Sequence, residues 1–82
     1  MIRSFAEPRV ETFFMHGICP ARWRDFEDVA KRKLDMLDAA AKLSDVRMAA
    51  VSGDQYELPH AQFRVYFRWT DQGPANIEIA DR

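Results

Sequence analysis

The chain has 82 residues, a mass of 9.6 kDa and a formal net charge of −1 at pH 7. This length gives one domain, residues 1–82, and leaves no room for a second. Area scaling gives a folded surface of about 5,100 Å² and an unfolded one of about 13,900 Å², so roughly 63% is buried. A net charge near zero argues against broad electrostatic attraction to nucleic acid, although a local basic surface is compatible with it.

The cysteine and histidine content argues against metal chemistry. Cys19 is the only cysteine, which excludes an internal disulfide and a Cys-rich zinc site. His16 and His60 lie far apart in the sequence, so we expect no metal and no other cofactor. The first twenty residues carry charges, and no stretch approaches eighteen apolar residues. We therefore expect a cytoplasmic protein in a reducing compartment, with no membrane partner.

The first half of the chain predicts a short strand and two helices. Residues 2–5 alternate apolar and polar side chains, as a strand does. Pro8 and Gly17 stand where a helix commonly begins and ends. A second helix is predicted over residues 20–43 because apolar side chains recur there at steps of three and four residues. These side chains are Trp23, Phe26, Val29 or Ala30, Leu34, Leu37 and Ala41.

The second half of the chain predicts strands. Residues 46–51 favour a strand, Gly53 and Asp54 a turn, and Pro59 ends the run that follows. Residues 63–69 alternate most clearly, with four apolar side chains on one face, Phe63, Val65, Phe67 and Trp69, and three polar ones on the other, Arg64, Tyr66 and Arg68. Residues 70–74 have the composition of a turn, and a closing strand follows.

The apolar faces of this hairpin predict its register, since a slip of one residue would turn every side chain over. On the apolar face the predicted pairs are Trp69 with Ala75, Phe67 with Ile77 and Val65 with Ile79. On the other face they are Arg68 with Asn76, Tyr66 with Glu78 and Arg64 with Ala80. The simplest architecture is an α+β fold with two N-terminal helices packed on one face of a small, mainly antiparallel sheet.

The row of Arg64, Tyr66 and Arg68 has two interpretations. Guanidinium groups bind phosphate oxygens and an aromatic ring stacks on a base, so the row suits RNA. Alternatively it is an ordinary solvated face, on which Glu78 forms an ion pair with a neighbouring arginine. His60, just before this strand, is a candidate acid or base because the ordinary pKa of histidine is near neutrality.

Several stretches, taken together and in order, resemble the HigB branch of the RelE/ParE toxin superfamily, also known as plasmid maintenance killer proteins. They are residues 1–5 (MIRSF), 20–23 (PARW), 32–40 (RKLDMLDAA), 62–69 (QFRVYFRW) and 77–81 (IEIAD). The resemblance implies the toxin of a type II toxin–antitoxin system. Such a toxin cuts mRNA on the ribosome without a metal, by attack of a ribose 2′-hydroxyl on the adjacent phosphate, and so stops translation and growth.

The resemblance also implies roles for particular residues and partners. Its place in the motif gives Arg64 the role of holding the scissile phosphate, and Asp81 that of accepting or orienting a proton. His60 is a further catalytic candidate, while Arg68, Tyr66 and Arg82 are expected to contact RNA. The implied partners are the ribosome with its mRNA and a HigA-type antitoxin with a helix-turn-helix domain.

The chain departs from the pattern of that branch at two places. Members usually carry Leu-Lys-Gly-Asp-Arg before the strand and end in Asp-Tyr-His, where this chain has residues 51–55 (VSGDQ) and 81–82 (DR). Its middle is also shorter. These differences leave open a second hypothesis, an attenuated toxin homologue that mainly binds its antitoxin or the ribosome. A third is the gyrase inhibition found elsewhere in the superfamily.

Overall fold

The computed structural model describes residues 1–81. Its helices are α1 (Pro8–His16), the 3₁₀ helix η1 (Ala21–Phe26), α2 (Glu27–Ala39) and the 3₁₀ turn η2 (Leu43–Asp45). Its strands are β1 (Ala49–Ser52), β2 (Gln55–Pro59), β3 (Phe63–Thr70) and β4 (Gly73–Asp81), which form one antiparallel sheet in the order β1-β2-β3-β4. The α+β class and the two helices before the sheet are as the sequence predicts.

Helix α1 begins and ends where proline and glycine predict. Pro8 is its first residue, and Gly17 follows its last. Gly17 adopts a φ of 72°, in the left-handed region that favours glycine, and its backbone N–H donates to the carbonyl oxygen of Phe13 at 3.0 Å. Local sequence therefore determines both ends of this helix.

The predicted second helix is broken into two pieces, η1 and α2. Phe26 lies at the junction, with a φ of −125° and a ψ of 20° that no α-helix adopts. In a 3₁₀ helix side chains three residues apart lie above one another, so Trp23 and Phe26 both face the core. Trp23 meets Phe13 edge-on at 5.7 Å between ring centroids, and Phe26 stacks on Phe63 at 4.4 Å. Packing of these rings overrides the continuous helical pattern.

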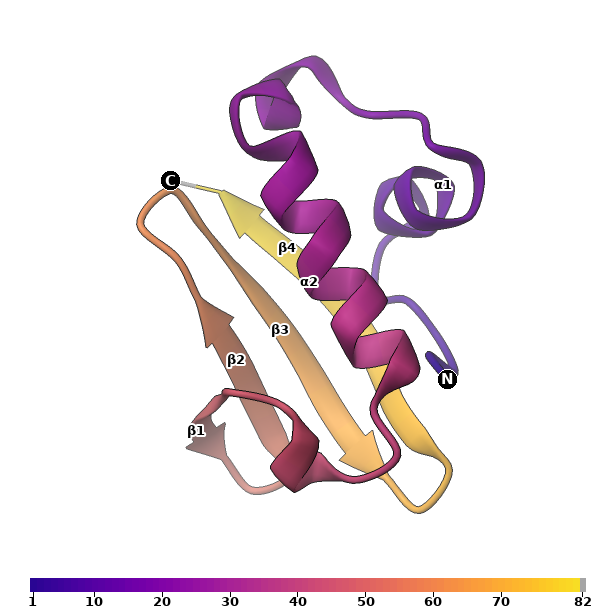
Figure 1. Cartoon of the computed structure of the whole chain (residues 1–82), viewed down its shortest axis with the longest axis vertical. Helices are drawn as coiled ribbons and strands as arrows, with labels where there is room; N and C mark the ends of the chain where they lie inside the picture. The colour runs from indigo at the N-terminus through magenta and orange to yellow at the C-terminus, as the bar shows by residue number, and fades with distance from the viewer. Residues whose placement is uncertain (82) are drawn as a thin grey trace.

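Helix α2 lies across one face of the sheet, and α1 lies beside β4 (Figure 1). Of the four apolar side chains that the alternation places on one face of β3, Phe63, Val65 and Phe67 are buried and Trp69 is partly buried. Leu34 and Leu37 of α2 are fully buried. The solvent-accessible surface is 5050 Å², in agreement with the value expected for a monomer of this mass. One core thus lies between α2 and the sheet.

The N-terminal segment runs along the outer edge of β4. Phe5 forms a single parallel bridge with Ile77, so the strand predicted over residues 2–5 is reduced to one pairing. The Arg3 N–H donates to the Pro74 carbonyl at 2.8 Å, and the Ala6 N–H donates to that of Ile77 at 2.8 Å. These contacts lie on both sides of an irregularity in β4.

That irregularity is a bulge opposite Phe67, and it corrects part of the predicted register. The pairs of Arg64 with Ala80, Val65 with Ile79 and Tyr66 with Glu78 are confirmed. At the bulge, the predicted pair of Phe67 with Ile77 is not formed. Beyond it the observed pairs are shifted by one residue, so the predicted pairs Arg68–Asn76 and Trp69–Ala75 are wrong: Arg68 pairs with Ala75, Trp69 with Pro74 and Thr70 with Gly73.

Asn76 is the residue that the bulge accommodates. Its φ of 55° lies in the left-handed region, which asparagine tolerates better than most residues. Its backbone N–H donates to the Ser4 hydroxyl oxygen at 3.0 Å, and that hydroxyl donates to Asn76 Oδ1 at 3.3 Å. The bulge therefore turns β4 toward the N-terminal segment.

The region of residues 44–62 forms a short edge strand and its partner. The predicted strand over residues 46–51 begins later, at Ala49, and Gly53 makes the predicted turn with a φ of 55°. Strand β1 pairs only with the first three residues of β2, as Ala49 with Glu57, Ala50 with Tyr56 and Ser52 with Gln55. Pro59, which has no N–H, lies beyond the reach of this pairing.

Substitution of Asn76 by valine should destabilise the fold. Valine at this left-handed φ is strained, so we expect a loss of about 1–2 kcal/mol in the free energy of unfolding, measured by urea denaturation. Asn76→Gly relieves the backbone strain and removes only the hydrogen bond that the Ser4 hydroxyl donates to Asn76 Oδ1, so it should cost less. Equal losses for the two variants would show that the bulge does not depend on the backbone of Asn76.

Candidate functional site

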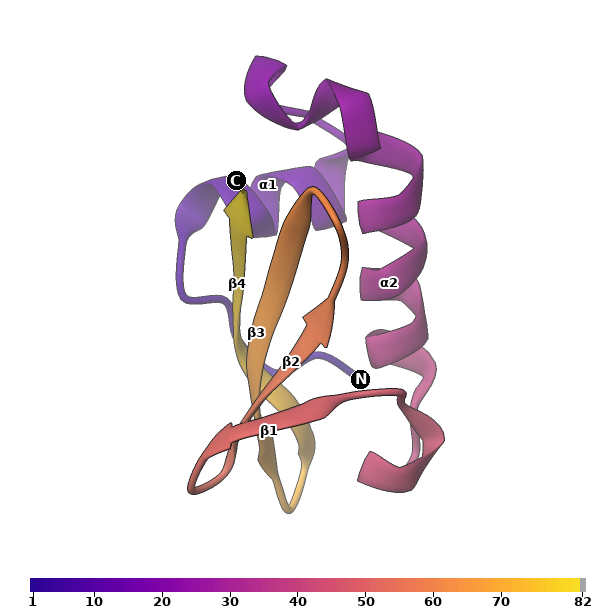
Figure 2. The same ribbon diagram turned by 90° about the vertical axis from the view of Figure 1, so that its left-hand side faces the viewer.

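Helix α2 lies along one face of the sheet (Figure 2). The polar row of β3 lies on the opposite face, which we call the open face. Because side chains alternate along strands, directly paired residues share a face. The pairings of β3 with β2 and β4 therefore place Glu57 and Glu78 on either side of Tyr66 on this face. The charged and aromatic members of the open face are Glu57, Arg64, Tyr66, Arg68 and Glu78.

Arg64 and Glu57 form the central ion pair of the open face. Arg64 Nη1 donates to Glu57 Oε1 at 3.3 Å, and the two side chains are 28% and 19% exposed. Tyr66 pairs with Glu57 across the strands and lies two residues from Arg64 on the same face. A partly buried cation, a carboxylate and a phenol therefore lie together, which suits binding of a phosphate beside a proton acceptor.

Glu57 is the site residue that the sequence analysis missed. Pro59 interrupts the run of residues 56–58, so the sequence supplies no register for β2 against β3. Pairing of Pro59 with Arg64 across the strands is what brings Glu57 next to the guanidinium group. The ion pair expected with Glu78 is formed with Glu57 instead.

Arg68 lies at the other end of the row and is held by a different acid. Its Nη1 donates to Asp54 Oδ1 at 2.6 Å, with side chains 48% and 56% exposed. Asp54 belongs to the turn between β1 and β2. An ion pair this exposed contributes about 0.2–1 kcal/mol, so an anionic ligand can compete with Asp54 for Arg68.

Asp81 does not share the open face with Arg64. It pairs with Phe63, whose side chain is buried and stacks on Phe26 of η1, whereas Arg64 pairs with Ala80 one position before it. Alternation therefore places the two residues on opposite faces of the sheet. Asp81 Oδ2 accepts a hydrogen bond from Arg22 Nε at 2.7 Å. This ion pair links η1 to the end of β4.

This ion pair keeps the Asp81 carboxylate ionised. Burial acts to raise the pKa of Asp81, but the hydrogen bonds from Arg22 and from backbone, with the charges of Arg22 and Arg9, outweigh it and lower the pKa below its usual value. A carboxylate with a lowered pKa is a weak acceptor of protons. Both its face and its chemistry separate Asp81 from the phosphate-binding role predicted for Arg64.

His60 lies in the loop between β2 and β3, at the same end of the sheet as Arg64. Its ring centroid is 4.6 Å from that of Phe63, and its Nδ1 accepts the backbone N–H of Gln62 at 3.2 Å. Nδ1 is therefore occupied, and Nε2 is the nitrogen left for proton transfer. Arg82, the last predicted RNA contact, lies outside the described residues.

Further features of residues 1–81 bear on the class of protein. No three or more histidine, cysteine, aspartate or glutamate side chains in this part of the chain are grouped so as to hold a metal ion. No helix within it has the length and apolar character needed to cross a membrane. No protein-family model matches the sequence, and a search of curated proteins found no match.

The Asp81–Arg22 pair predicts a pH-dependent contribution to stability. Because folding lowers the pKa of Asp81, the pair stabilises the protein above the ordinary pKa of about 3.9, and this stabilisation is lost as the pH falls through the lower, folded value. Asp81→Asn should therefore reduce the free energy of unfolding at pH 7 by about 0.2–1 kcal/mol, the range of partly exposed pairs.

Urea denaturation of the wild type and Asp81→Asn from pH 2 to pH 7 measures this effect. The two curves should converge at acid pH. Asp71→Asn, at an exposed acid of the β3–β4 turn, is the matched control and should lie near the wild type throughout. A difference between Asp81→Asn and wild type that is constant with pH would contradict the assignment.

Proposed function

We propose that this protein is the toxin of a type II toxin–antitoxin system, an endonuclease that cuts mRNA on the ribosome and so inhibits translation. The observation that carries the proposal is the partly buried Arg64 beside Glu57 and Tyr66 on the open face. The α+β fold, with two helices before an antiparallel sheet, supports it. Its partners in this proposal are the ribosome with its mRNA and a HigA-type antitoxin with a helix-turn-helix domain.

In the proposed reaction Arg64 binds the scissile phosphate and stabilises the charge that develops on it. Partial burial strengthens a hydrogen bond from a guanidinium group to a phosphate oxygen. Tyr66 stacks on a base and Arg68 contacts a neighbouring phosphate, as single-stranded RNA is commonly held. The phosphate replaces Glu57 as the direct partner of Arg64.

The released Glu57 carboxylate then takes the proton-acceptor role that the sequence suggests for Asp81. It accepts the proton of the ribose 2′-hydroxyl while the 2′ oxygen forms a bond to phosphorus. The bond from phosphorus to the 5′ oxygen breaks, and water protonates this leaving oxygen. The products are a 2′,3′-cyclic phosphate and a 5′-hydroxyl end, and the step needs no metal.

Arg64→Ala tests this proposal directly. Induced expression of the wild type in bacteria should arrest growth and produce cut transcripts, and Arg64→Ala should reduce cleavage by about 100-fold or more, as loss of one charge-stabilising donor does. Arg32→Ala, at an exposed arginine of α2, is the matched control and should remain toxic. Normal growth and intact transcripts with the wild type would overturn the endonuclease.

A second function is a binding protein that keeps the toxin fold without cutting RNA. The observation in its favour is that both predicted catalytic charges are already neutralised: Arg64 by Glu57, and Asp81 by Arg22 on the opposite face. Such a protein would bind its antitoxin or the ribosome.

Glu57→Gln distinguishes the two functions. Loss of a hydrogen bond between charged groups is worth about 1.5–3 kcal/mol, so freeing Arg64 should raise its affinity for a short single-stranded RNA about tenfold, measured by fluorescence anisotropy. For an endonuclease, cleavage in a translation extract should fall in this variant while RNA binding increases. Cleavage unchanged from wild type would remove Glu57 from the mechanism, and absence of cleavage in both proteins would support the binding protein.

A further inference from the structure

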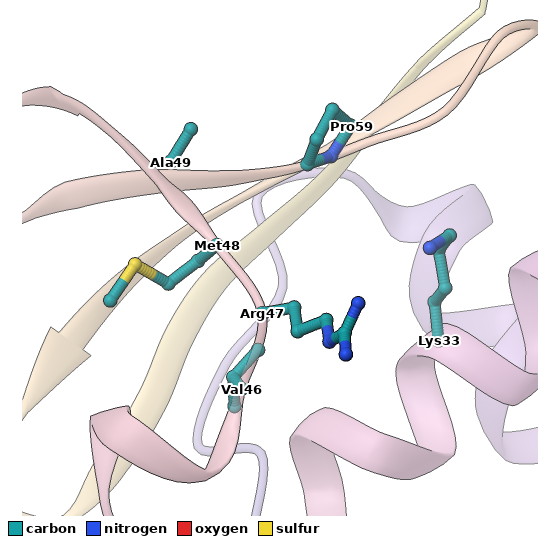
Figure 3. A pocket seen from close by; sticks show the side chains of 6 residues that line it. All are labelled: Lys33, Val46, Arg47, Met48, Ala49 and Pro59. Carbon is teal, nitrogen blue, oxygen red and sulfur yellow. The ribbon is translucent and has the colours of Figure 1, made fainter.

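A groove of about 480 Å³ lies at the edge of the sheet, between α2 and the segment that leads into β1 (Figure 3). It forms because β1 pairs with only the first three residues of β2, which leaves the outer edge of β2 at Pro59 uncovered. None of its residues belongs to the Glu57–Arg64–Tyr66 cluster. Its lining residues are Lys33, Val46, Arg47, Met48, Ala49 and Pro59.

Two cations without acidic partners line this groove. Arg47 extends toward α2, from which Lys33 rises on the other side (Figure 3). No acidic residue is part of the lining. Within residues 1–81, neither cation takes part in an ion pair, in contrast to Arg64 and Arg68 of the open face. The groove therefore offers its positive charge to an anion from outside the chain.

The rest of the lining is apolar. Val46 is buried, Met48 is partly buried, and Ala49 and Pro59 are exposed. No aromatic side chain is present on which a base could stack, as sites for single-stranded RNA usually require. A small inorganic anion would cover the two cations and leave these apolar walls in water. An occupant that carries both carboxylates and apolar side chains matches the whole surface.

The neighbouring strand favours an extended occupant. β1 is the outermost strand of the sheet, and all four of its residues are exposed. Beyond Glu57, the outer edge of β2 bounds the groove at Pro59 and has no strand partner from β1 within the described residues, and open strand edges pair with extended peptides. Charge, apolar lining and free edge thus point to the same class of ligand.

We propose that this groove binds an extended, acidic segment of a partner protein. Carboxylates of the segment pair with Lys33 and Arg47, while its apolar side chains pack on Val46, Met48 and Pro59. This proposal goes beyond the endonuclease function and does not depend on it. The groove would serve the same partner whether or not the open face cuts RNA.

The test uses the full chain and a synthetic peptide in which aspartate or glutamate alternates with valine or leucine, with binding measured by fluorescence anisotropy. The double variant Lys33→Gln/Arg47→Gln should bind this peptide at least tenfold more weakly than wild type. Arg24→Gln/Arg32→Gln removes two exposed cations outside the groove and is the matched control, with unchanged affinity. Circular dichroism verifies that each variant is folded.

Reversal of the two charges provides a second test in case neutralisation of Lys33 and Arg47 perturbs the fold. Lys33→Glu/Arg47→Glu should lose the acidic peptide and bind its counterpart with lysine in place of each acid. Equal affinity of wild type and double variants for the acidic peptide would overturn the proposal. So would displacement of the peptide by inorganic phosphate or single-stranded RNA at equal concentration, or self-association of the chain through this groove. Loss of cleavage in Arg64→Ala has no bearing on any of these results.

Discussion

The packing of β3 against α2 is the interaction on which the rest of the structure depends. Phe63, Val65 and Phe67 are at most 1% exposed, and Phe63 also stacks on Phe26. Full burial of each such side chain contributes about 1.5–3 kcal/mol. A slip of one residue would place arginines in the core and leave these side chains in water, so the alternation fixes the face of every neighbouring residue. The polar side chains of β3 lie on the open face because its apolar side chains are packed on the opposite face of the sheet.

Alternation of this strength is visible in the sequence, and so the fold class, the β3–β4 hairpin near Arg64 and the first helix are predictable from it. The bulge at Asn76 is not predictable in this way because its cause is long-range. The N-terminal segment donates hydrogen bonds to β4 and accepts others from it at this point. The break between η1 and α2 has a similar origin, since ring packing of Trp23 and Phe26 outweighs a helical pattern that continues through them.

The candidate site was partly predictable for the same reason. Arg64, Tyr66 and Arg68 share a face because they alternate with buried residues. Glu57 was not predictable, since it reaches Arg64 only through the β2–β3 pairing beyond Pro59. The face of Asp81 already follows from the predicted register, which pairs Arg64 with Ala80 and so Phe63 with Asp81. The family resemblance implies that Arg64 and Asp81 belong to one site. The alternation of side chains along the paired strands places them on opposite faces of the sheet.

The paired and unpaired cations predict where an anion would bind most tightly. On the open face, the two arginines already form ion pairs with Glu57 and Asp54. Binding of RNA there would therefore gain only the difference in free energy between an arginine–phosphate and an arginine–carboxylate interaction. Arg64 is the less exposed of the two, and in the proposed reaction its exchange of Glu57 for a phosphate releases the Glu57 carboxylate next to the reacting atoms. In the groove, Lys33 and Arg47 have no such competitor within residues 1–81, and an acidic segment gains their full interaction. We therefore expect tighter binding of an anionic partner at the edge of the sheet than on the open face, where binding displaces an internal acid.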